Sequence, residues 1–421
     1  MDLIADLQAR GLVHDTTDLS ALRARLADGP IGLYIGFDPT ADSLHVGHLV
    51  GQLLMRRFQL AGHRPFPLAG GATGMVGDPG GRSEERNLLD ADTLRHNVEC
   101  IKMQLSTLLD FEPGAAQATL VNNADWTVPV TMLEFLRDVG KHFTVNQMMA
   151  KDSVRSRLES DHGLSYTEFS YMLLQADDFR HLYEHHGVQL QAGASDQWGN
   201  IVAGVELIRR RLGAQAYALT HPLMTKSDGT KFGKSLGGAV WLDARRTSPY
   251  QFRQFWIQSD DQLVGVYLKM LSLRRLDEIG AIIAEHAQAP ERRIAQRALA
   301  DEMTALVHGS DALRAAREAA DVLFGGDPTS ASTQALQLIA SEVPSVRVPA
   351  VLDGIRVHEL LIAAGVVKTT SDVSRLLTQG AVRAGNRILD ADGMLATSDL
   401  LRGEFLLLRK GKREFVAGKV S

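Results

Sequence analysis

Two histidines, three residues apart, follow the first apolar run of the chain and could donate hydrogen bonds to a polyphosphate. Asp38-Pro39-Thr40 ends that run, and His45-Val46-Gly47-His48 opens the helical pattern that comes next. The N-terminus of a helix suits phosphate because it presents unpaired N–H groups and the positive end of a dipole. Gly47 would leave space for a flat base or sugar to approach the backbone. The alternative is that both histidines merely cap a turn, and this segment alone does not decide.

A second candidate for phosphate binding is a loop at residues 226–235, K-S-D-G-T-K-F-G-K-S, with three lysines and two glycines. Such a loop could close over phosphates, and Lys231 and Lys234 would then stabilise charge on a leaving pyrophosphate. A solvated basic loop is the alternative interpretation.

Polar residues also follow two other strand-like runs. Residues 70–82 are rich in glycine but lack the Gly-Lys-Ser/Thr ending of a P-loop, so we interpret them as a turn that carries Asp78 into a pocket. Residues 193–200, G-A-S-D-Q-W-G-N, bring Asp196 and Gln197 to another strand end. Ligands of parallel sheets bind at such strand ends.

One predicted helix carries a polar stripe. Tyr171, Gln175 and Asp178 are spaced i, i+4 and i+7, which places them on one helical face. Most such stripes are only the solvated side of a helix. This one combines a phenol, an amide and an acid, and a strand with a polar end follows it.

Three patterns favour structure over chemistry. Residues 181–185 match the H-x-x-E-H pattern of some zinc peptidases, but no acidic ligand is evident downstream, so we predict no metal held by the protein. Ser195 lacks the final glycine of a nucleophile elbow. Cys100 lies in an apolar helical pattern and is predicted to be a core residue.

Alternating apolar runs and helical periodicities must position these groups. Up to about residue 248 the pattern predicts a parallel sheet covered by helices on both faces. The expected strands are 31–37, 65–69, 118–122, 188–192 and 216–219, and the expected helices are 48–59, 92–109, 131–141, 167–185 and 197–211. From 248 to about 325 the pattern is almost entirely helical.

The remainder of the chain changes in composition. Residues 326–350 are rich in Ser, Thr, Pro and Gly, and we interpret them as a linker. Residues 351–421 combine two short helical patterns with a β-like end that turns at Gly411. Residues 353–421 contain 11 basic and 8 acidic residues although the whole chain has a net charge of −5, which hints at a polyanion-binding module.

Composition excludes several classes of protein. The chain has 421 residues, 45% of them hydrophobic and 23% charged, which is typical of globular domains rather than disorder. A single cysteine excludes an internal disulfide and fits a reducing compartment. No apolar run is long enough for a membrane span, and the first residues lack a targeting pattern, so we expect a cytoplasmic protein with no membrane partner.

The order of these segments resembles that of class I aminoacyl-tRNA synthetases. The fuller strings are similar to those of the bacterial tyrosyl-tRNA synthetase family: Y-I-G-F-D-P-T-A-D-S-L-H-V-G-H, V-G-D-P-G-G-R, S-Y-M-L-L-Q-A-D-D-F, S-D-Q-W-G-N and T-K-S-D-G-T-K-F-G-K-S. The resemblance implies a Rossmann-like α/β catalytic domain with a helical insertion at 1–247. It further implies an α-helical anticodon-side domain at 248–325 and, beyond the linker, a small α+β ribosomal-protein-like RNA-binding domain at 351–421.

The resemblance also implies a reaction and its site residues. ATP, carrying Mg²⁺ as a substrate complex, would activate L-tyrosine, and the tyrosyl group would pass to tRNA(Tyr); a homodimer is expected. The phenol would meet Tyr34 and Asp178, and the ammonium group Asp78, Tyr171 and Gln175. ATP would meet Thr40, His45, Gly47 and His48, the adenylate Asp38, Gly193, Asp196 and Gln197, and the pyrophosphate Lys231 and Lys234.

Two other functions remain open on the sequence. A tryptophanyl enzyme would share the fold, but Tyr34 and Asp178 suit a phenol better than an indole. An RNA-binding protein that has reused a synthetase body would not need the intact phosphate segments. The sequence departs from the family pattern at Val46, where isoleucine is usual, and at Phe232-Gly233, which replace Met-Ser. Ile35 and Gly51 replace polar residues of some relatives, which concerns only ATP affinity.

Overall fold

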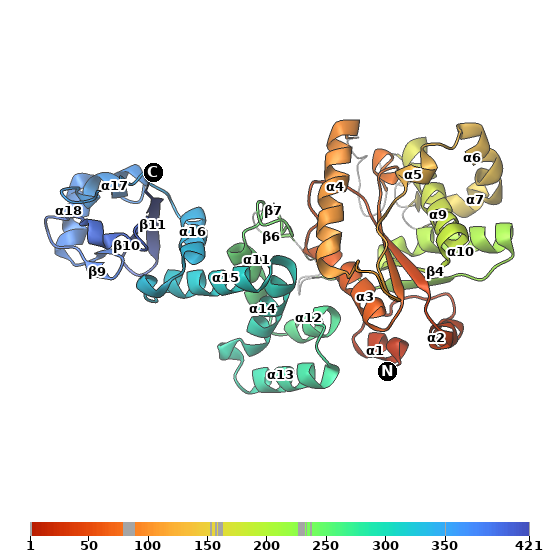
Figure 1. Cartoon of the computed structure of the whole chain (residues 1–421), viewed down its shortest axis with the longest axis horizontal. Coiled ribbons are helices and arrows are strands. Elements are labelled where there is room, and N and C mark those ends of the chain that lie inside the picture. The colour runs from red at the N-terminus through yellow and green to blue at the C-terminus, as the bar shows by residue number, and fades with distance from the viewer. Residues whose placement is uncertain are drawn as a thin grey trace. The chain divides into compact units, whose positions relative to one another are not determined.

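A computed structural model describes residues 2–78, 89–151, 154–155, 158, 163–225, 232, 234–235, 238–349 and 351–420 (Figure 1). The chain divides into two compact units. Unit 1 comprises Met1–Thr247 and Phe255–Leu299, and unit 2 comprises Ser248–Gln254 and Ala300–Ser421. Each unit has its own sheet.

The sheet of unit 1 has five strands in the order β3-β2-β1-β4-β5, all parallel. They are β1 (Gly32–Phe37), β2 (Arg64–Ala69), β3 (Val121–Asn122), β4 (Val188–Ala194) and β5 (Tyr217–His221). The strand order reverses between β1 and β4, which is where an open parallel sheet leaves a crevice at the carboxyl ends of its strands. The predicted parallel α/β sheet is confirmed.

Helices cover this sheet on both sides (Figure 1). On one side lie α3 (Leu49–Leu60) and α4 (Ala91–Leu108), and on the other α9 (Tyr166–His186) and α10 (Trp198–Leu212). Helix α9 begins where the Ser165 side chain accepts a hydrogen bond from the N–H of Glu168, and it ends at Gly187, which adopts the left-handed conformation with φ of 66°. At Gly204 of α10 a Cβ atom would lie 2.9 Å from Phe179, so glycine permits the close packing of α9 and α10.

Shorter elements complete unit 1 before residue 248. The N-terminal helices are α1 (Leu3–Ala9) and α2 (Leu19–Asp28). Between β3 and α9 lie α5 (Ala124–Thr127), α6 (Met132–Asp138) and α7 (Val145–Met149). A two-stranded ribbon, β6 (Lys234–Ser235) with β7 (Gly238–Ala239), follows β5.

The region predicted to be helical is helical, but it is shared between the two units. Its helices are α11 (Pro249–Ile257), α12 (Val264–Leu271), α13 (Leu276–Gln288), α14 (Ile294–His308) and α15 (Ser310–Leu323). The buried guanidinium groups of Arg10 and Arg57 both donate to the carbonyl of Ser272, just after α12. These hydrogen bonds fix the middle of the region to unit 1, whereas residues 248–254 and 300–325 belong to unit 2, so residues 248–325 do not form one separate unit.

The interpretation of residues 326–350 as a linker is wrong. They contain α16 (Thr333–Glu342), which begins where the Ser332 side chain accepts from the N–H of Ala335. Leu336 and Ile339 of α16 are buried in a core shared with α15, β10 and β11. The Ser- and Thr-rich composition hid a short apolar helical face, because the hydroxyl residues cap the helix instead of breaking it.

Unit 2 ends in an α+β module, as predicted. Helices α17 (Val357–Ala363) and α18 (Thr370–Thr378) precede strands β8 (Val382–Ala384), β9 (Arg387–Ile388), β10 (Phe405–Lys410) and β11 (Glu414–Lys419). The sheet is antiparallel in the order β11-β10-β8-β9. Gly411 makes the predicted turn between β10 and β11 with φ of 61°. Within the described residues, no helix is both long and apolar enough to cross a membrane.

Candidate active site

A cavity of about 710 Å³ opens at the carboxyl ends of β1 and β4, where the strand order reverses. It brings together most of the site residues that the sequence predicted: Tyr34, Asp38, Thr40, His45, Gly47, His48, Asp78, Tyr171, Asp178, Gly193, Asp196 and Gln197. Gln175 does not belong to its lining. Lys231 lies outside the described residues, and only the backbone of Lys234, in β6, falls within them.

Asp178 is a buried carboxylate held by two donors at one end of the cavity. Its side chain projects from α9, and the residue is only 2% exposed. Trp126 Nε1 donates to Oδ1 at 2.9 Å, and Asn123 Nδ2 donates to Oδ2 at 3.0 Å. Burial raises the pKa of Asp178 to about 7, although both hydrogen bonds act to lower it. A carboxylate poised in this way is expected of a functional site more than of a structural one.

Tyr34 is a second buried polar group in the same cavity. It stands on β1, its ring lies 5.5 Å from that of Phe179, and its hydroxyl donates to the carbonyl of Gln175 at 3.3 Å. Burial, together with the charge of Asp178, raises the pKa of Tyr34 well above its usual value. The hydroxyl therefore remains protonated and able to donate. Gln175 also has a buried Oε1 that has no hydrogen-bond partner in the described part of the chain.

Asp38 and Tyr171 are joined directly, although the sequence assigned them to different parts of the ligand. The Tyr171 hydroxyl donates to Asp38 Oδ2 at 2.8 Å, and Thr73 Oγ1 donates to Asp38 Oδ1 at 2.8 Å. Asn123 Nδ2 in turn donates to Thr73 Oγ1 at 3.0 Å. The ends of β1, β2 and β3 are thus connected to α9 by one polar network.

A second network lies at the end of β4. Gln197 Nε2 donates to Asp78 Oδ2 at 2.6 Å, and Asn200 Nδ2 donates to Gln197 Oε1 at 3.2 Å. Lys151 Nζ donates to Asn200 Oδ1 at 3.1 Å. Burial lowers the pKa of Lys151 to about 7, an effect that the charge of Asp78 partly opposes. Asp78, Gln197 and Lys151 form a group of polar side chains that could orient a charged ligand.

His45 and His48 both cap the turn at residues 46–48 and line the cavity, so the two interpretations of the sequence are compatible. Their rings stack with centroids 4.0 Å apart. His48 Nδ1 accepts from the N–H of His45, and His45 Nδ1 accepts from the N–H of Gly47. In both rings the proton is therefore assigned to Nε2, which is the hydrogen-bond donor. Burial and the neighbouring His45 lower the pKa of His48 well below its usual value.

Gly47 leaves room for the His45 ring in this turn. A Cβ atom at residue 47 would lie 2.8 Å from Cε1 of His45, a distance that real contacts do not show. The glycine thus allows the His45 ring to fold back onto the turn. This is a different reason from the close approach of a ligand that the sequence suggested.

Sequence reasoning missed Asn123, Trp126, Thr73 and Lys151. Asn123 directly follows β3 and Trp126 lies in α5, the next element, so the rule applied to the other strand ends would have led to this segment. Their function depends on the contact with Asp178, which is remote in sequence. No sequence pattern around Lys151 marked it as a site residue.

The patterns set aside on the sequence have structural roles. His181 stacks against Trp126 with ring centroids 4.4 Å apart and against His185 with centroids 4.1 Å apart. Cys100 is buried in α4, as predicted. Among the residues that the structure describes, no three His, Cys, Asp or Glu side chains gather in a way that could hold a metal ion.

Comparisons with known proteins agree with this geometry. The family model "tRNA synthetases class I (W and Y)" matches residues 26–325, and the model "Tyrosine--tRNA ligase SYY-like C-terminal domain" matches residues 335–417. The chain is 51% identical to a tyrosine--tRNA ligase of Opitutus terrae over 100% of both chains. It is 49% identical to that of Geobacillus stearothermophilus over 99% of both. A C-terminally truncated mitochondrial tyrosyl-tRNA synthetase of Aspergillus nidulans superposes with a TM-score of 0.70 at 33% identity, over 77% of this chain and 94% of that one.

The raised pKa of Asp178 predicts a pH-dependent cost in stability. Its pKa is 3.8 for an exposed carboxyl and about 7 in the fold. Between these values the folded protein binds more protons than the unfolded chain, so this group makes the free energy of unfolding fall as pH rises from about 4 to 7. The full effect is about 4 kcal/mol, and Asp178→Asn removes it.

Urea unfolding of both proteins between pH 4 and 8 measures this effect. We expect the difference in free energy of unfolding, variant minus wild type, to increase with pH until about 7 and then to level off. A difference that is constant with pH would contradict the buried, proton-binding Asp178.

Proposed function

The chain belongs to the tyrosine–tRNA ligases, a family of class I tRNA synthetases, and from this premise we propose how its residues carry out the reaction. In the first step L-tyrosine and ATP form tyrosyl-adenylate and pyrophosphate. In the second step the tyrosyl group passes to the 3′-terminal adenosine of tRNA(Tyr).

The observation that carries the assignment is the buried carboxylate of Asp178 in a cavity that also contains the Tyr34 hydroxyl. We assign Asp178 as the acceptor of the phenolic proton of the substrate and Tyr34 as a donor to the phenolic oxygen. Trp126 and Asn123 support this role because they hold the carboxylate in place and satisfy one lone pair on each oxygen. Phenylalanine would leave these polar groups dehydrated and unpaired, an effect for which tyrosine-specific sites are a standard illustration.

The ammonium group of tyrosine is assigned to Asp78, Tyr171 and Gln175. Asp78 supplies the negative charge, while the hydroxyl of Tyr171 and the amide of Gln175 supply acceptor oxygens. The buried Gln175 Oε1 has no partner among the described residues, but Gln175 does not line the cavity, so its part in this assignment requires the side chain to turn toward the ligand. The adenylate is assigned to Asp38, Gly193, Asp196 and Gln197, all of which line the same cavity.

The phosphates of ATP are assigned to the end of the cavity formed by Thr40, His45, Gly47 and His48. The Nε2 protons of both histidines support this role, since they can donate to phosphate oxygens without carrying a charge. Lys231 and Lys234, named from the sequence, would stabilise the departing pyrophosphate. Mg²⁺ would arrive with ATP as part of the substrate.

The chemistry of activation needs no general base from the protein. The tyrosine carboxylate is already ionised, and one of its oxygens attacks the α-phosphorus. A new P–O bond forms as the bond to the pyrophosphate oxygen breaks, and its electron pair leaves with pyrophosphate. Orientation of the two substrates and stabilisation of the charge that moves onto pyrophosphate are therefore the tasks left to the side chains. The ribose hydroxyl of the tRNA then attacks the carbonyl of the adenylate, and AMP leaves.

Pyrophosphate exchange tests the activation site and its specificity. For wild type we expect exchange that depends on tyrosine and is not supported by tryptophan. Tyr34→Phe removes one neutral donor and should reduce the preference for tyrosine over phenylalanine by about 2–13-fold, corresponding to about 0.5–1.5 kcal/mol. Asp178→Asn should reduce it far more, because hydrogen bonds to a charged group are stronger.

Asp177→Asn is the matched control for Asp178→Asn. Asp177 is also largely buried on α9, but it pairs with Arg180 and does not line the cavity. For Asp177→Asn we expect the ratio of kcat/KM for tyrosine to kcat/KM for phenylalanine to equal that of wild type. If Asp177→Asn and Asp178→Asn had equal ratios of kcat/KM for tyrosine and phenylalanine, another group would have to recognise the phenol. Exchange with tryptophan in wild type would favour the tryptophanyl alternative.

We assign tRNA binding in unit 2 to a basic cluster, Arg383, Arg409, Lys412 and Arg413. These residues line a cavity of about 470 Å³. Arg383 and Arg409 lie directly opposite each other on β8 and β10, an unfavourable pairing of like charges. In the part of unit 2 that the structure describes, none of these four cations forms an ion pair with a carboxylate, whereas Lys410 pairs with Glu414. A phosphate backbone would neutralise the cluster.

Arg409→Gln tests the basic cluster. It should weaken tRNA binding and lower the slope of log K against log salt by about 1, while tyrosine activation is unchanged. The control is Arg375→Gln, because Arg375 of α18 already pairs with Asp372. A salt slope that changes equally in both variants would mean that only net charge matters.

We also propose that the chain forms a homodimer in the cytoplasm. An apolar face on α5–α7 and the segments between them supports the dimer: Val128, Val130, Met132, Leu133, Leu136, Val145 and Met149 are all exposed, Leu133 by 79%. Large exposed apolar faces of this kind are rare unless another protein covers them, and a two-fold dimer lets one face cover itself. The single, buried Cys100, which requires no oxidising environment, supports the proposed compartment.

Leu133→Asp tests the dimer. A charge on this face would be buried in the dimer without a partner. We therefore expect the dimer to be weaker by about 2 kcal/mol or more, which corresponds to a Kd roughly 30-fold higher in sedimentation velocity. Leu60→Asp on α3 changes a leucine that is 62% exposed but lies outside the apolar face, and it should leave the dimer intact. A monomeric wild type would contradict the proposal.

A further inference from the structure

The segment after β7 is hydrogen-bonded to the segment that leads into His45. The N–H of Val46 donates to the carbonyl of Val240 at 3.0 Å, and the N–H of Leu242 donates to the carbonyl of Leu44 at 2.8 Å. His45 and Trp241 thus lie opposite each other in a short antiparallel bridge. The backbone of His45 is therefore fixed by a segment almost two hundred residues away in sequence.

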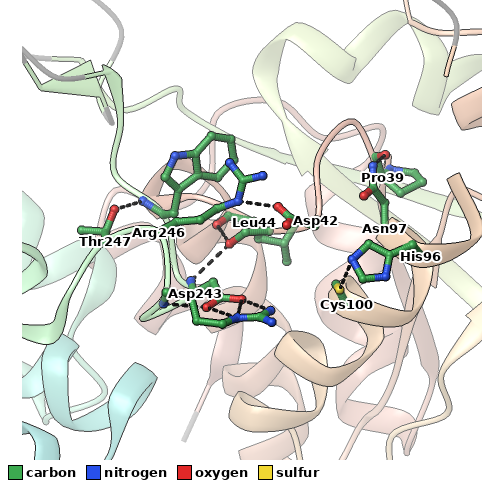
Figure 2. A network of polar contacts seen from close by, with 12 residues as sticks. Pro39, Asp42, Leu44, His96, Asn97, Cys100, Asp243, Arg246 and Thr247 are labelled. Atoms are coloured by element: carbon green, nitrogen blue, oxygen red, sulfur yellow. Dashed lines mark hydrogen bonds and ion pairs between the residues drawn. The ribbon is translucent and has the colours of Figure 1, made fainter. Parts of the chain in front are cut away.

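Arg246 contacts a residue of each of these two segments (Figure 2). Its guanidinium forms an ion pair with Asp42 and lies 4.8 Å from the centroid of the Trp241 ring. The N–H of Trp241 donates to Thr247 Oγ1 at 3.0 Å, which limits the movement of its backbone. One cation therefore connects the residue three positions before His45 to the residue opposite His45.

The contact continues through the rings into the cavity. The Trp241 ring meets the ring of His45 nearly edge-on, with centroids 6.2 Å apart and planes at 65°. His45 in turn stacks on His48. Displacing Trp241 would remove one of the contacts that hold the His45 ring, beside its stacking on His48 and the hydrogen bond from the Gly47 N–H, and Nε2 would be held less firmly in its direction.

We propose that Arg246 is a positioning residue for activation: by holding Asp42 and Trp241 together it orients His45 toward the phosphates of ATP. This inference rests on the proposed function, in which His45 meets ATP. Arg246 itself does not line the cavity, so it acts through Trp241 and the 42–46 segment. A displacement of about 1 Å in such a group can reduce a rate by as much as about 100-fold.

The neighbouring arginine provides a matched control. Arg245 forms its ion pair with Asp243, whereas Arg246 forms its ion pair with Asp42. Both arginines are partly exposed, with 72% and 40% of their side chains accessible, so neither ion pair contributes much to folding. Arg245→Ala and Arg246→Ala therefore make the same change in charge one residue apart.

The experiment measures the single-turnover rate of adenylate formation in the full chain, with ATP and tyrosine varied separately. We expect Arg246→Ala to lower the rate at saturation by about 10- to 100-fold. The KM for tyrosine and the melting temperature should stay at their wild-type values. Arg246→Lys keeps a cation for Asp42 and Trp241 and should recover most of the rate, and Arg245→Ala should equal wild type.

A second measurement is independent of activity. The ring signals of His45 in a two-dimensional ¹H–¹⁵N spectrum should shift in Arg246→Ala and remain unchanged in Arg245→Ala. Equal rates and equal His45 signals in the two alanine variants would overturn the inference. A wild type that shows no exchange with tyrosine would instead reject the proposed function, while the His45 signals would still test the positioning.

Discussion

The buried carboxylate of Asp178 is the constraint on which the site depends. A charge 2% exposed on a helix facing a parallel sheet is unfavourable unless donors compensate for the lost water. Trp126 and Asn123 supply them, and both follow the short strand β3. The edge strand of the sheet, Val121–Asn122, thereby leads directly into the residues that hold this one side chain.

From Asp178 the polar contacts extend across the ends of the strands. Asn123 contacts Thr73 as well as Asp178, Thr73 contacts Asp38, and Asp38 contacts Tyr171 on the same helix as Asp178. The network is closed, since it leaves α9 at Asp178 and returns to it at Tyr171. Closed networks of this type fix each member from more than one direction, so a cavity lined by polar groups can keep one shape without a ligand.

Much of this arrangement could be predicted from the sequence. The alternation of apolar runs predicted every strand of the parallel sheet, and polar residues at strand ends predicted Asp38, Asp78 and Gln197 in one cavity. The bond between Asp38 and Tyr171 could not be predicted, because it depends on how α9 lies over the sheet. Helix α16 was missed because its apolar face is short and is surrounded by residues that also favour loops.

In the proposed site, the tautomers of His45 and His48 would divide the phosphate contacts into two physical kinds. An imidazole N–H attracts phosphate as a dipole at hydrogen-bond range, and dissolved salt does not screen such a contact. A lysine attracts it as a full charge, over a distance that salt shortens. If the proposed assignment holds, the histidine end of the cavity would bind phosphate by geometry at any ionic strength, and attraction of the nucleotide from solution would depend on the cationic groups alone.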